Sequence, residues 1–579
     1  MDLLLIIVVA VVGVAVVTAL AEKLGVAGAL VLVALGLGIG VLPFVEVPEI
    51  DPELILVGVL PPLLYAAAVR LPSIEFRRDL VPISGLAVLL VVITALVLGW
   101  FFSLVLPDVG FALGVALGAI VSPTDAVATG IAKRLGISTR VTTMLEGESL
   151  LNDATALVLL RTALIAVVAG TFSFGSAFGS FVWAVVIAIV IGAIVGLAAM
   201  RLRGWIRNTG ASTAIGFTVP FLAYLPTEHL DGSGLVAAVI AGIVAGQGAQ
   251  RWFTPEQRLS DEVNWRTVEL VLEGGIFLIM GLELDQIVTD VVSRNEGIAL
   301  PTVVAIAALL IVLAVRAGYV AFLLWAGRTR SRTMDRSRIE QLDARLDAIA
   351  EQGWPTASGA GGGRLEPSPE RAQRRITSMR ERVARALADF DYYQSTPLGW
   401  KHGTIIVWAG MRGVVTLAAA QTIPRTVDSR PELVYIAFLV ALVSLMLQGF
   451  SLPWLVKKLK LSVDADGDNR VEQDMLDAEL RAAAVAALDD PSLTRRDGRA
   501  FDAELRERTA LRYSTSPTDE TTAFARDMLE LRLALVEAQR SYLTRLTSRG
   551  RFSTHTLRHT LAELDAEQLS LELRLRGDD

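Results

Sequence analysis

Residues 146–154 (EGESLLNDA) place four polar side chains at helical spacing inside an otherwise apolar stretch. Glu148 and Asn152 are one helical turn apart, and Ser149 and Asp153 form the next such pair, so all four are expected on one polar face. A carboxylate, a carboxamide and a hydroxyl at one depth offer hard oxygen ligands for a small cation. The alternative is a polar network that only joins helices. Because an unpaired carboxylate in a membrane is costly, we favour the cation site.

Two other apolar stretches are interrupted in a way that would break a membrane helix. Ser122-Pro-Thr124-Asp125 interrupts one of them, and 410–413 (GMRG) interrupts the other at Arg412. Proline removes a backbone donor, and a broken helix is tolerated at membrane depth only where it is buried or lines a wet cavity. A proline kink is the simpler explanation of the first interruption, but paired broken spans indicate a transporter's ion site. Asp125 and Arg412 are then expected to compensate the dipoles of the half-helices.

Other charged residues lie inside or at the ends of apolar stretches. Arg316 needs a carboxylate partner at its depth, and Glu148 is the best candidate; this pair would be structural because arginine keeps its proton. Glu273 and Glu283 lie near the ends of another apolar stretch, so we interpret them as interfacial residues rather than ligands.

The composition is that of an all-α membrane protein. Of 579 residues, 53% are hydrophobic and only 20% are charged, whereas a soluble chain carries roughly 25% charged residues. The apolar runs are long enough to cross about 30 Å of hydrocarbon as helices. Thirteen spans are expected, at residues 3–22, 26–44, 53–69, 80–106, 111–132, 142–169, 178–200, 211–226, 235–248, 266–284, 299–326, 403–424 and 433–457.

Basic residues in the loops predict the orientation, because Lys and Arg are retained on the cytoplasmic side. They follow the third, fifth, seventh, ninth and eleventh spans, whereas the loops 45–52, 107–110, 170–177 and 227–234 contain none. This pattern places the N-terminus outside and the C-terminus in the cytoplasm. The absence of cysteine excludes disulfides and thiolate chemistry.

Charge density divides the chain into four parts. We expect spans 1–11 in residues 1–326, a cytoplasmic insert in 327–400, spans 12 and 13 in 401–460, and a cytoplasmic helical tail in 461–579. The insert contains a Gly-rich linker at 357–363 between charged segments 336–352 and 367–392, and the tail contains two amphipathic helical segments at 527–546 and 555–576. A regulatory or assembly role is expected for the tail.

Three motifs together resemble a known family. EGESLLNDA at 146–154, SPTDAVA at 122–128 and WAGMRGVVTLA at 408–418 resemble the electroneutral sodium/proton exchanger branch (NhaP-type) of the monovalent cation:proton antiporter superfamily. The resemblance covers about residues 1–460. It implies thirteen helices with inverted repeats, two crossed broken helices and a homodimer.

The resemblance also implies a role for each matching residue. Asp153 would carry the cation and the proton in turn, with Asn152 beside it, and Na⁺ would be held by Asp153, Ser149 and Thr124. Further roles concern the surroundings of this site: Asp125 at the helix crossing, Glu148 paired with Arg316, and Arg412 compensating the half-helix dipoles.

The chain departs from several relatives at Ala66, where they carry an acidic residue. No carboxylate of the third predicted span is therefore expected to bind the cation, and Tyr65 or water would substitute. This departure leaves the choice between Na⁺ and K⁺ open.

The implied function is secondary active transport, with Na⁺ exchanged electroneutrally for H⁺ across the plasma membrane for pH and cation homeostasis. K⁺ or Li⁺ are alternative cations, and a K⁺/H⁺ antiporter, a cation channel and a receptor that signals through the tail are alternative functions. A single buried aspartate between broken helices favours a binding site over a channel filter, and the tail contains no recognisable output domain. The expected partners are Na⁺, H⁺ and the lipid bilayer. No cofactor, nucleic acid or enzymatic activity is expected, because the sequence contains no metal triad, nucleophile–base pair or phosphate loop.

Overall fold

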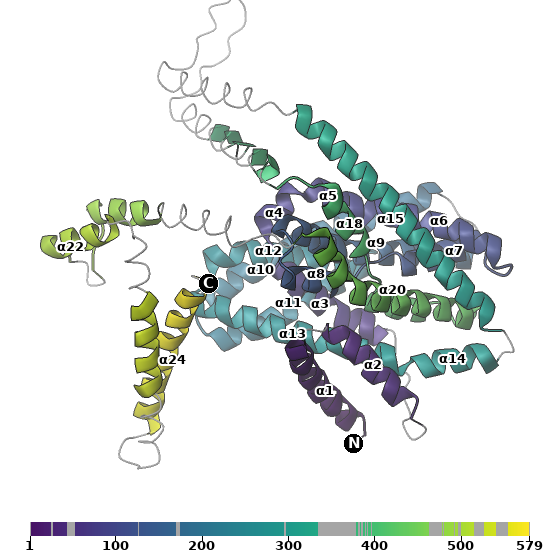
Figure 1. Ribbon diagram of the computed structural model, residues 1–579, viewed down its shortest axis with the longest axis horizontal. Coiled ribbons are helices and arrows are strands. Elements are labelled where there is room, and N and C mark those ends of the chain that lie inside the picture. The colour runs from purple at the N-terminus through teal and green to yellow at the C-terminus, as the bar shows by residue number, and fades with distance from the viewer. Residues whose placement is uncertain are drawn as a thin grey trace, which may run out of the picture. The chain divides into compact units, whose positions relative to one another are not determined.

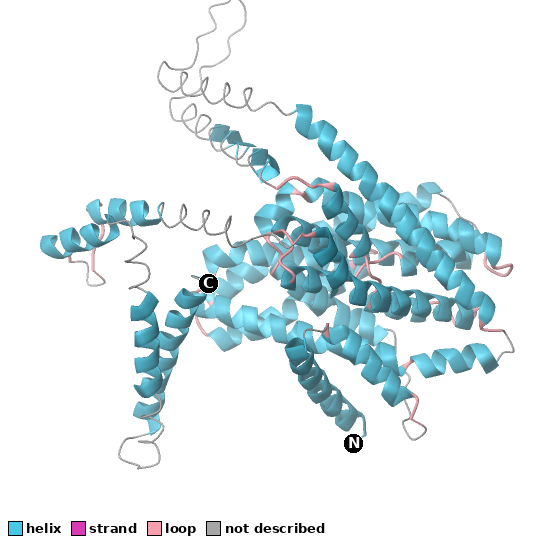
Figure 2. Cartoon of the chain, in the orientation of Figure 1, coloured by secondary structure: helices cyan, strands magenta, loops and turns pink. Residues whose placement is uncertain are grey.

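The computed structural model is helical throughout the part of the chain that it describes (Figure 2). Beyond an isolated bridge between Thr494 and Ala500, no strand occurs in that part. The described residues are 2–24, 27–42, 53–125, 127–169, 174–293, 297–333, 396–461, 480–490, 492–495, 499–514, 526–539 and 554–577, with single residues or short runs at 378–394 and residue 478. The predicted linker 357–363 and the segment 336–352 lie outside them, as does most of 367–392.

The described helices follow one another from Asp2 to Thr333, and again from Trp400 to Leu459 (Figure 1). They are α1 (Asp2–Leu24), α2 (Gly28–Gly40), η1 (Leu54–Val59), α3 (Leu60–Val69), α4 (Ser73–Arg78), α5 (Leu80–Ser84), η2 (Gly85–Leu89), α6 (Leu90–Val105), α7 (Phe111–Val121), α8 (Val127–Arg134), α9 (Thr139–Ala169), α10 (Phe174–Trp205), α11 (Thr209–His229), α12 (Gly234–Trp252), α13 (Pro255–Leu282), α14 (Leu284–Ser293), α15 (Ala299–Thr333), α18 (Trp400–Trp408), α19 (Val414–Gln421) and α20 (Arg430–Leu459).

Five helical stretches of the described chain are long and apolar enough to cross a membrane. They are Leu80–Val105, Thr139–Val167, Phe178–Trp205, Ala299–Thr329 and Arg430–Leu459. Every range predicted as a span contains one or more helices. This confirms the prediction of a helical protein with apolar membrane-spanning helices. The count of thirteen spans stays a prediction.

The chain forms two compact units, Met1–Ala465 and Asp466–Asp579. The second contains α22 (Ala503–Ser514) and α24 (Thr554–Gly577). Within it, Arg532 donates to Glu567 at 2.8 Å, which joins the helical residues 526–539 to α24. The four-part division predicted from charge density remains a proposal.

Two predicted spans are each divided into a pair of helices. The range 111–132 consists of α7 and α8 with non-helical residues from Ser122, and 403–424 consists of α18 and α19 with non-helical residues around Arg412. The sequence did not predict the π-helical turns η1 and η2, which precede α3 and α6, because side-chain patterns carry no signal for a single wide turn.

Helix α9 lies between two clusters of buried apolar side chains. The larger cluster receives Leu150 and Leu160 from α9, together with side chains of α6, α7, α15 and α20. The smaller receives Ala154 from α9, together with Tyr65 and Ala66 of α3 and residues of α10, α11, α12 and α13. The polar segment of α9 is therefore enclosed by packing on both sides.

Buried ionic contacts fix the ends of several helices. Arg203 at the end of α10 donates to Asp261 of α13 at 2.5 Å and to Ser212 of α11 at 3.2 Å. Arg140 in the first turn of α9 donates through Nε and Nη2 to the two carboxylate oxygens of Asp79, each at 3.0 Å, and through Nη1 to the carbonyl of Thr396 at 2.6 Å. Since removing one member of a buried pair leaves an uncompensated charge, these contacts hold α9, α10 and α13 in place.

Candidate cation-binding site

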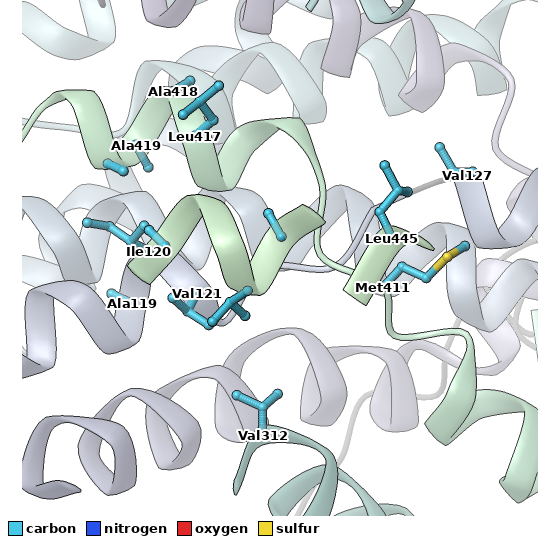
Figure 3. Close-up of a cluster of buried hydrophobic side chains, with 14 of the residues drawn as sticks. Ala119, Ile120, Val121, Val127, Val312, Met411, Leu417, Ala418, Ala419 and Leu445 are labelled. Atoms are coloured by element: carbon cyan, nitrogen blue, oxygen red, sulfur yellow. The ribbon is translucent and has the colours of Figure 1, made fainter. Parts of the chain in front are cut away.

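The two interrupted helices meet at their breaks. The backbone N–H of Asp125 donates to the carbonyl of Met411 at 2.7 Å. Arg412 donates through Nε to the carbonyl of Val121, the last residue of α7, at 3.2 Å, and its side chain also contacts the carbonyl of Gly410. Each break thus satisfies backbone groups that the other has released. Figure 3 shows the apolar side chains packed around this contact, among them Val121, Val127, Met411 and Leu445.

Gly413 makes the close approach of Asp125 possible. A Cβ atom at Gly413 would lie 1.6 Å from Oδ2 of Asp125, so no larger residue fits without displacing that carboxylate. The other oxygen of Asp125 accepts the N–H of Val127 at 3.3 Å, at the start of α8. A negative charge at the beginning of a helix is favoured by the helix dipole. The structure therefore places Asp125 between the two breaks.

A cavity of about 560 Å³ adjoins these breaks. Asp153 and Ser149 of α9 line it together with Thr124 and Asp125, so four residues predicted for the cation site share one wall. Asp153 is only 6% exposed, and among the described residues its carboxylate has no hydrogen bond or ion pair. A buried carboxylate without a partner is costly in a membrane, so Asp153 is the candidate site for a cation or a proton.

The other predicted residues of α9, Glu148 and Asn152, do not line the cavity. Asn152 donates to the hydroxyl of Thr124 at 2.6 Å, and its own side-chain oxygen has no partner among the described residues. Glu148 accepts two hydrogen bonds from Arg316, one of them at 2.8 Å, and both residues are 1% exposed. The sequence placed all four side chains on one polar face. In the structure only Ser149 and Asp153 line the cavity. Glu148 and Asn152 each precede one of them by one residue, and consecutive residues of a helix point about 100° apart.

Arg316 connects this pair to the second broken helix. It donates through Nε at 3.0 Å and through Nη2 at 2.8 Å to the carbonyl of Ile406, near the end of α18. The carbonyls at the C-terminal end of a helix carry partial negative charge. The guanidinium of Arg316 therefore binds two negative groups, the Ile406 carbonyl and the Glu148 carboxylate. Arg316 thereby joins α9, α15 and α18.

Charged side chains that the sequence did not assign to the site also line the cavity. Lys133 pairs with Glu146 and Arg70 pairs with Glu269 in its wall. The Lys133 side chain is 53% exposed, so the cavity extends from exposed cations to the buried Asp153.

Three further residues of the wall were missed or interpreted differently. Glu273 of α13 lines the cavity, although its position in the sequence indicated an interfacial residue. Thr129 and Thr416 also line it, and their hydroxyl oxygens have no hydrogen-bond partner among the described residues. In the sequence, each of these threonines is a single polar residue in an apolar stretch. Such a residue does not indicate which way its side chain points.

Long apolar helices, and a cavity in which a buried carboxylate lies beside two helix breaks, are typical of an ion-binding membrane protein of the transporter class. The family model described as "Sodium/hydrogen exchanger, transmembrane" matches residues 7–342 and 382–458. The chain therefore belongs to the sodium/hydrogen exchanger family, as the sequence motifs predicted.

Individual relatives agree with this assignment. An uncharacterised Na⁺/H⁺ exchanger of Mycobacterium bovis is 27% identical over 98% of this chain and 96% of its own length. A sodium, potassium, lithium and rubidium/H⁺ antiporter of Bacillus pumilus is 24% identical over 73% of this chain and 57% of its own length. The solved sodium proton antiporter MjNhaP1 of Methanocaldococcus jannaschii, at 18% identity and a TM-score of 0.55, covers 80% of this chain and 100% of its own. This last likeness concerns the fold alone.

The Glu148–Arg316 pair predicts a stability effect. Glu148→Ala or Arg316→Ala should each destabilise the protein by about 3–5 kcal/mol, because either change leaves a buried charge without its partner. The double substitution should recover part of that loss. Thermal unfolding in detergent measures all four forms of the cycle. Losses that simply add would show that the two residues do not stabilise each other.

Proposed function

We propose that this chain exchanges Na⁺ for H⁺ across the membrane by binding them in turn at Asp153. The observation that carries the proposal is the buried Asp153 carboxylate, which lacks a partner among the described residues and lines the cavity beside both helix breaks. A carboxylate oxygen holds either a proton or a cation, so the two ions compete for it. Ser149 and Thr124 supply neutral oxygens at the same wall, where they ligate the cation in place of water.

The fixed charges around Asp153 support its role as the single carrier. Glu148 is held by Arg316, and an arginine does not release its proton in a protein. Asn152 cannot ionise. Asp125 lies at the start of α8, where the helix dipole favours its charged form. With one carrier, one half-cycle moves a single Na⁺ and the other moves a single H⁺ in the opposite direction. The net charge transferred is zero, and the exchange is electroneutral.

The accessible side of the site follows from the basic residues of the cavity. Arg70, Lys133 and Arg134 line it, and the distribution of Lys and Arg in the loops predicts a cytoplasmic position for all three. The cavity then opens to the cytoplasm, with the N-terminus outside and the C-terminus inside. Exchange requires a second arrangement in which Asp153 is reached from the other side.

The family description and the names of the relatives all include Na⁺. They therefore do not favour the K⁺/H⁺ alternative. A channel is disfavoured, because a buried carboxylate without a partner among the described residues lines the cavity, which is typical of a binding site rather than a filter. We further propose, from the family resemblance, a homodimer in the plasma membrane with crossed broken helices and a regulatory tail.

Asp153→Asn should reduce exchange in proteoliposomes to less than about 1% of the unaltered protein, because an amide binds neither a proton nor Na⁺ in exchange for the other. Dissipation of an imposed pH gradient on addition of Na⁺ is the measurement. Asp108→Asn makes the same chemical change at an exposed residue outside the cavity and should leave exchange unaltered. An Asp153→Asn protein that still dissipates the gradient would remove Asp153 from the mechanism.

Electroneutrality predicts a steady-state Na⁺ distribution that does not respond to membrane potential. Moving a net charge would couple the distribution to voltage by about 2.3 kcal/mol per charge per 100 mV. A valinomycin potential clamped across proteoliposomes, with radioactive Na⁺ uptake as the readout, tests this directly. A distribution that shifts with voltage would show that a second carboxylate carries a proton.

A further inference from the structure

Five carboxylates line the cavity, and three of them are already engaged. Glu146 pairs with Lys133, Glu269 pairs with Arg70, and Asp125 accepts a hydrogen bond at the start of α8. The remaining two are Asp153 and Glu273. Among the described residues, neither of these has a hydrogen bond or an ion pair.

The position of Glu273 on α13 places it inward from the charged mouth. Arg266, Glu269 and Glu273 follow one another at helical spacing and all line the cavity. Four residues of α-helix span about 6 Å along the axis, so Glu273 lies about that far along α13 from the Arg70–Glu269 pair. The next helical positions in the wall, Gly274 and Phe277, carry no charge.

Helix α3 contributes no carboxylate to the cavity wall. Ala66 is fully buried in the smaller apolar cluster, where Trp265 of α13 also lies. The carboxylates that meet the cavity without a fixed partner therefore come from α9 and α13.

We infer that Glu273 forms a second binding station for the transported alkali cation, between the charged mouth of the cavity and Asp153. A cation that leaves water loses hydration, and a carboxylate without a fixed partner compensates that loss on the way to the buried site. Glu273 itself is partly exposed, whereas Asp153 is 94% buried and lies in the wall of the same cavity. The cation is therefore captured first at Glu273 and then passes to Asp153. In this role Glu273 binds only the cation and transfers no proton, so the exchange stays electroneutral. This inference rests on the proposed function.

Glu273→Gln tests the station. It should raise the apparent KM for cytoplasmic Na⁺ about tenfold, equivalent to ~1.4 kcal/mol of binding, and leave the maximal rate within about twofold. Glu283→Gln is the matched control, because it removes a carboxylate at the C-cap of α13, where Glu283 accepts a hydrogen bond from Gln421 at 3.2 Å outside the cavity. Its KM should stay that of the unaltered protein.

The outcomes separate the inference from the proposed function. If Asp153→Asn retains exchange, the proposed function fails. If Asp153→Asn is inactive while Glu273→Gln has the same KM as Glu283→Gln, only the station is overturned. A voltage-dependent Na⁺ distribution that disappears in Glu273→Gln would also overturn it, because Glu273 would then carry a proton.

If the Glu273→Gln protein fails to insert into the membrane, Glu273→Asp tests whether Glu273 binds the cation. That change keeps the charge but withdraws the carboxylate by one methylene. A KM raised by less than tenfold supports the station, whereas a KM identical to that of the unaltered protein contradicts it.

Discussion

The backbone groups released at two helix breaks must be satisfied inside a membrane, and in this chain they satisfy each other. A broken helix exposed to lipid would leave N–H and C=O groups without partners, which costs several kcal/mol for each group. The bond from the Asp125 N–H to the Met411 carbonyl and the bond from Arg412 to the Val121 carbonyl remove that cost. Gly413 is required for the approach, because any side chain there would occupy the position of the Asp125 carboxylate. The cavity lies beside this contact, so the ion site depends on it.

Helix α9 separates permanent charges from exchangeable ones. Glu148 is held by Arg316, which also binds the end of α18, and Asn152 is held by Thr124. Asp153 lines the cavity on another side of the same helix without such a partner among the described residues. A fixed ion pair positions the helix, while in the proposed exchange the carboxylate without a fixed ligand binds Na⁺ and H⁺ in turn. The proposed mechanism depends on this difference between neighbouring residues of α9.

Sequence reasoning predicted the features that follow from local chemistry. Proline in 122–125 and the GMRG segment predicted the breaks, and the need to neutralise a buried guanidinium selected Glu148 for Arg316. Features that depend on the rotation and neighbours of a helix were not predictable. Glu273 is charged and near the end of an apolar stretch, which is typical of an interfacial residue; its place in the cavity follows from how α13 packs. For the same reason Asn152 was expected on the cavity face, and the network of Arg203 with distant residues of α11 and α13 was not expected.

Competition between Na⁺ and H⁺ for the Asp153 carboxylate requires that a proton leaves when Na⁺ binds, and this release can be measured. Titrating Na⁺ into the purified protein by calorimetry, in buffers that differ in ionisation enthalpy, measures how many protons leave for each Na⁺ that binds. At a pH where Asp153 is protonated in most molecules, the account predicts release of about one proton per Na⁺, and no release from Asp153→Asn, because the two ions share the same oxygens. Na⁺ binding without proton release in the unaltered protein would contradict the account.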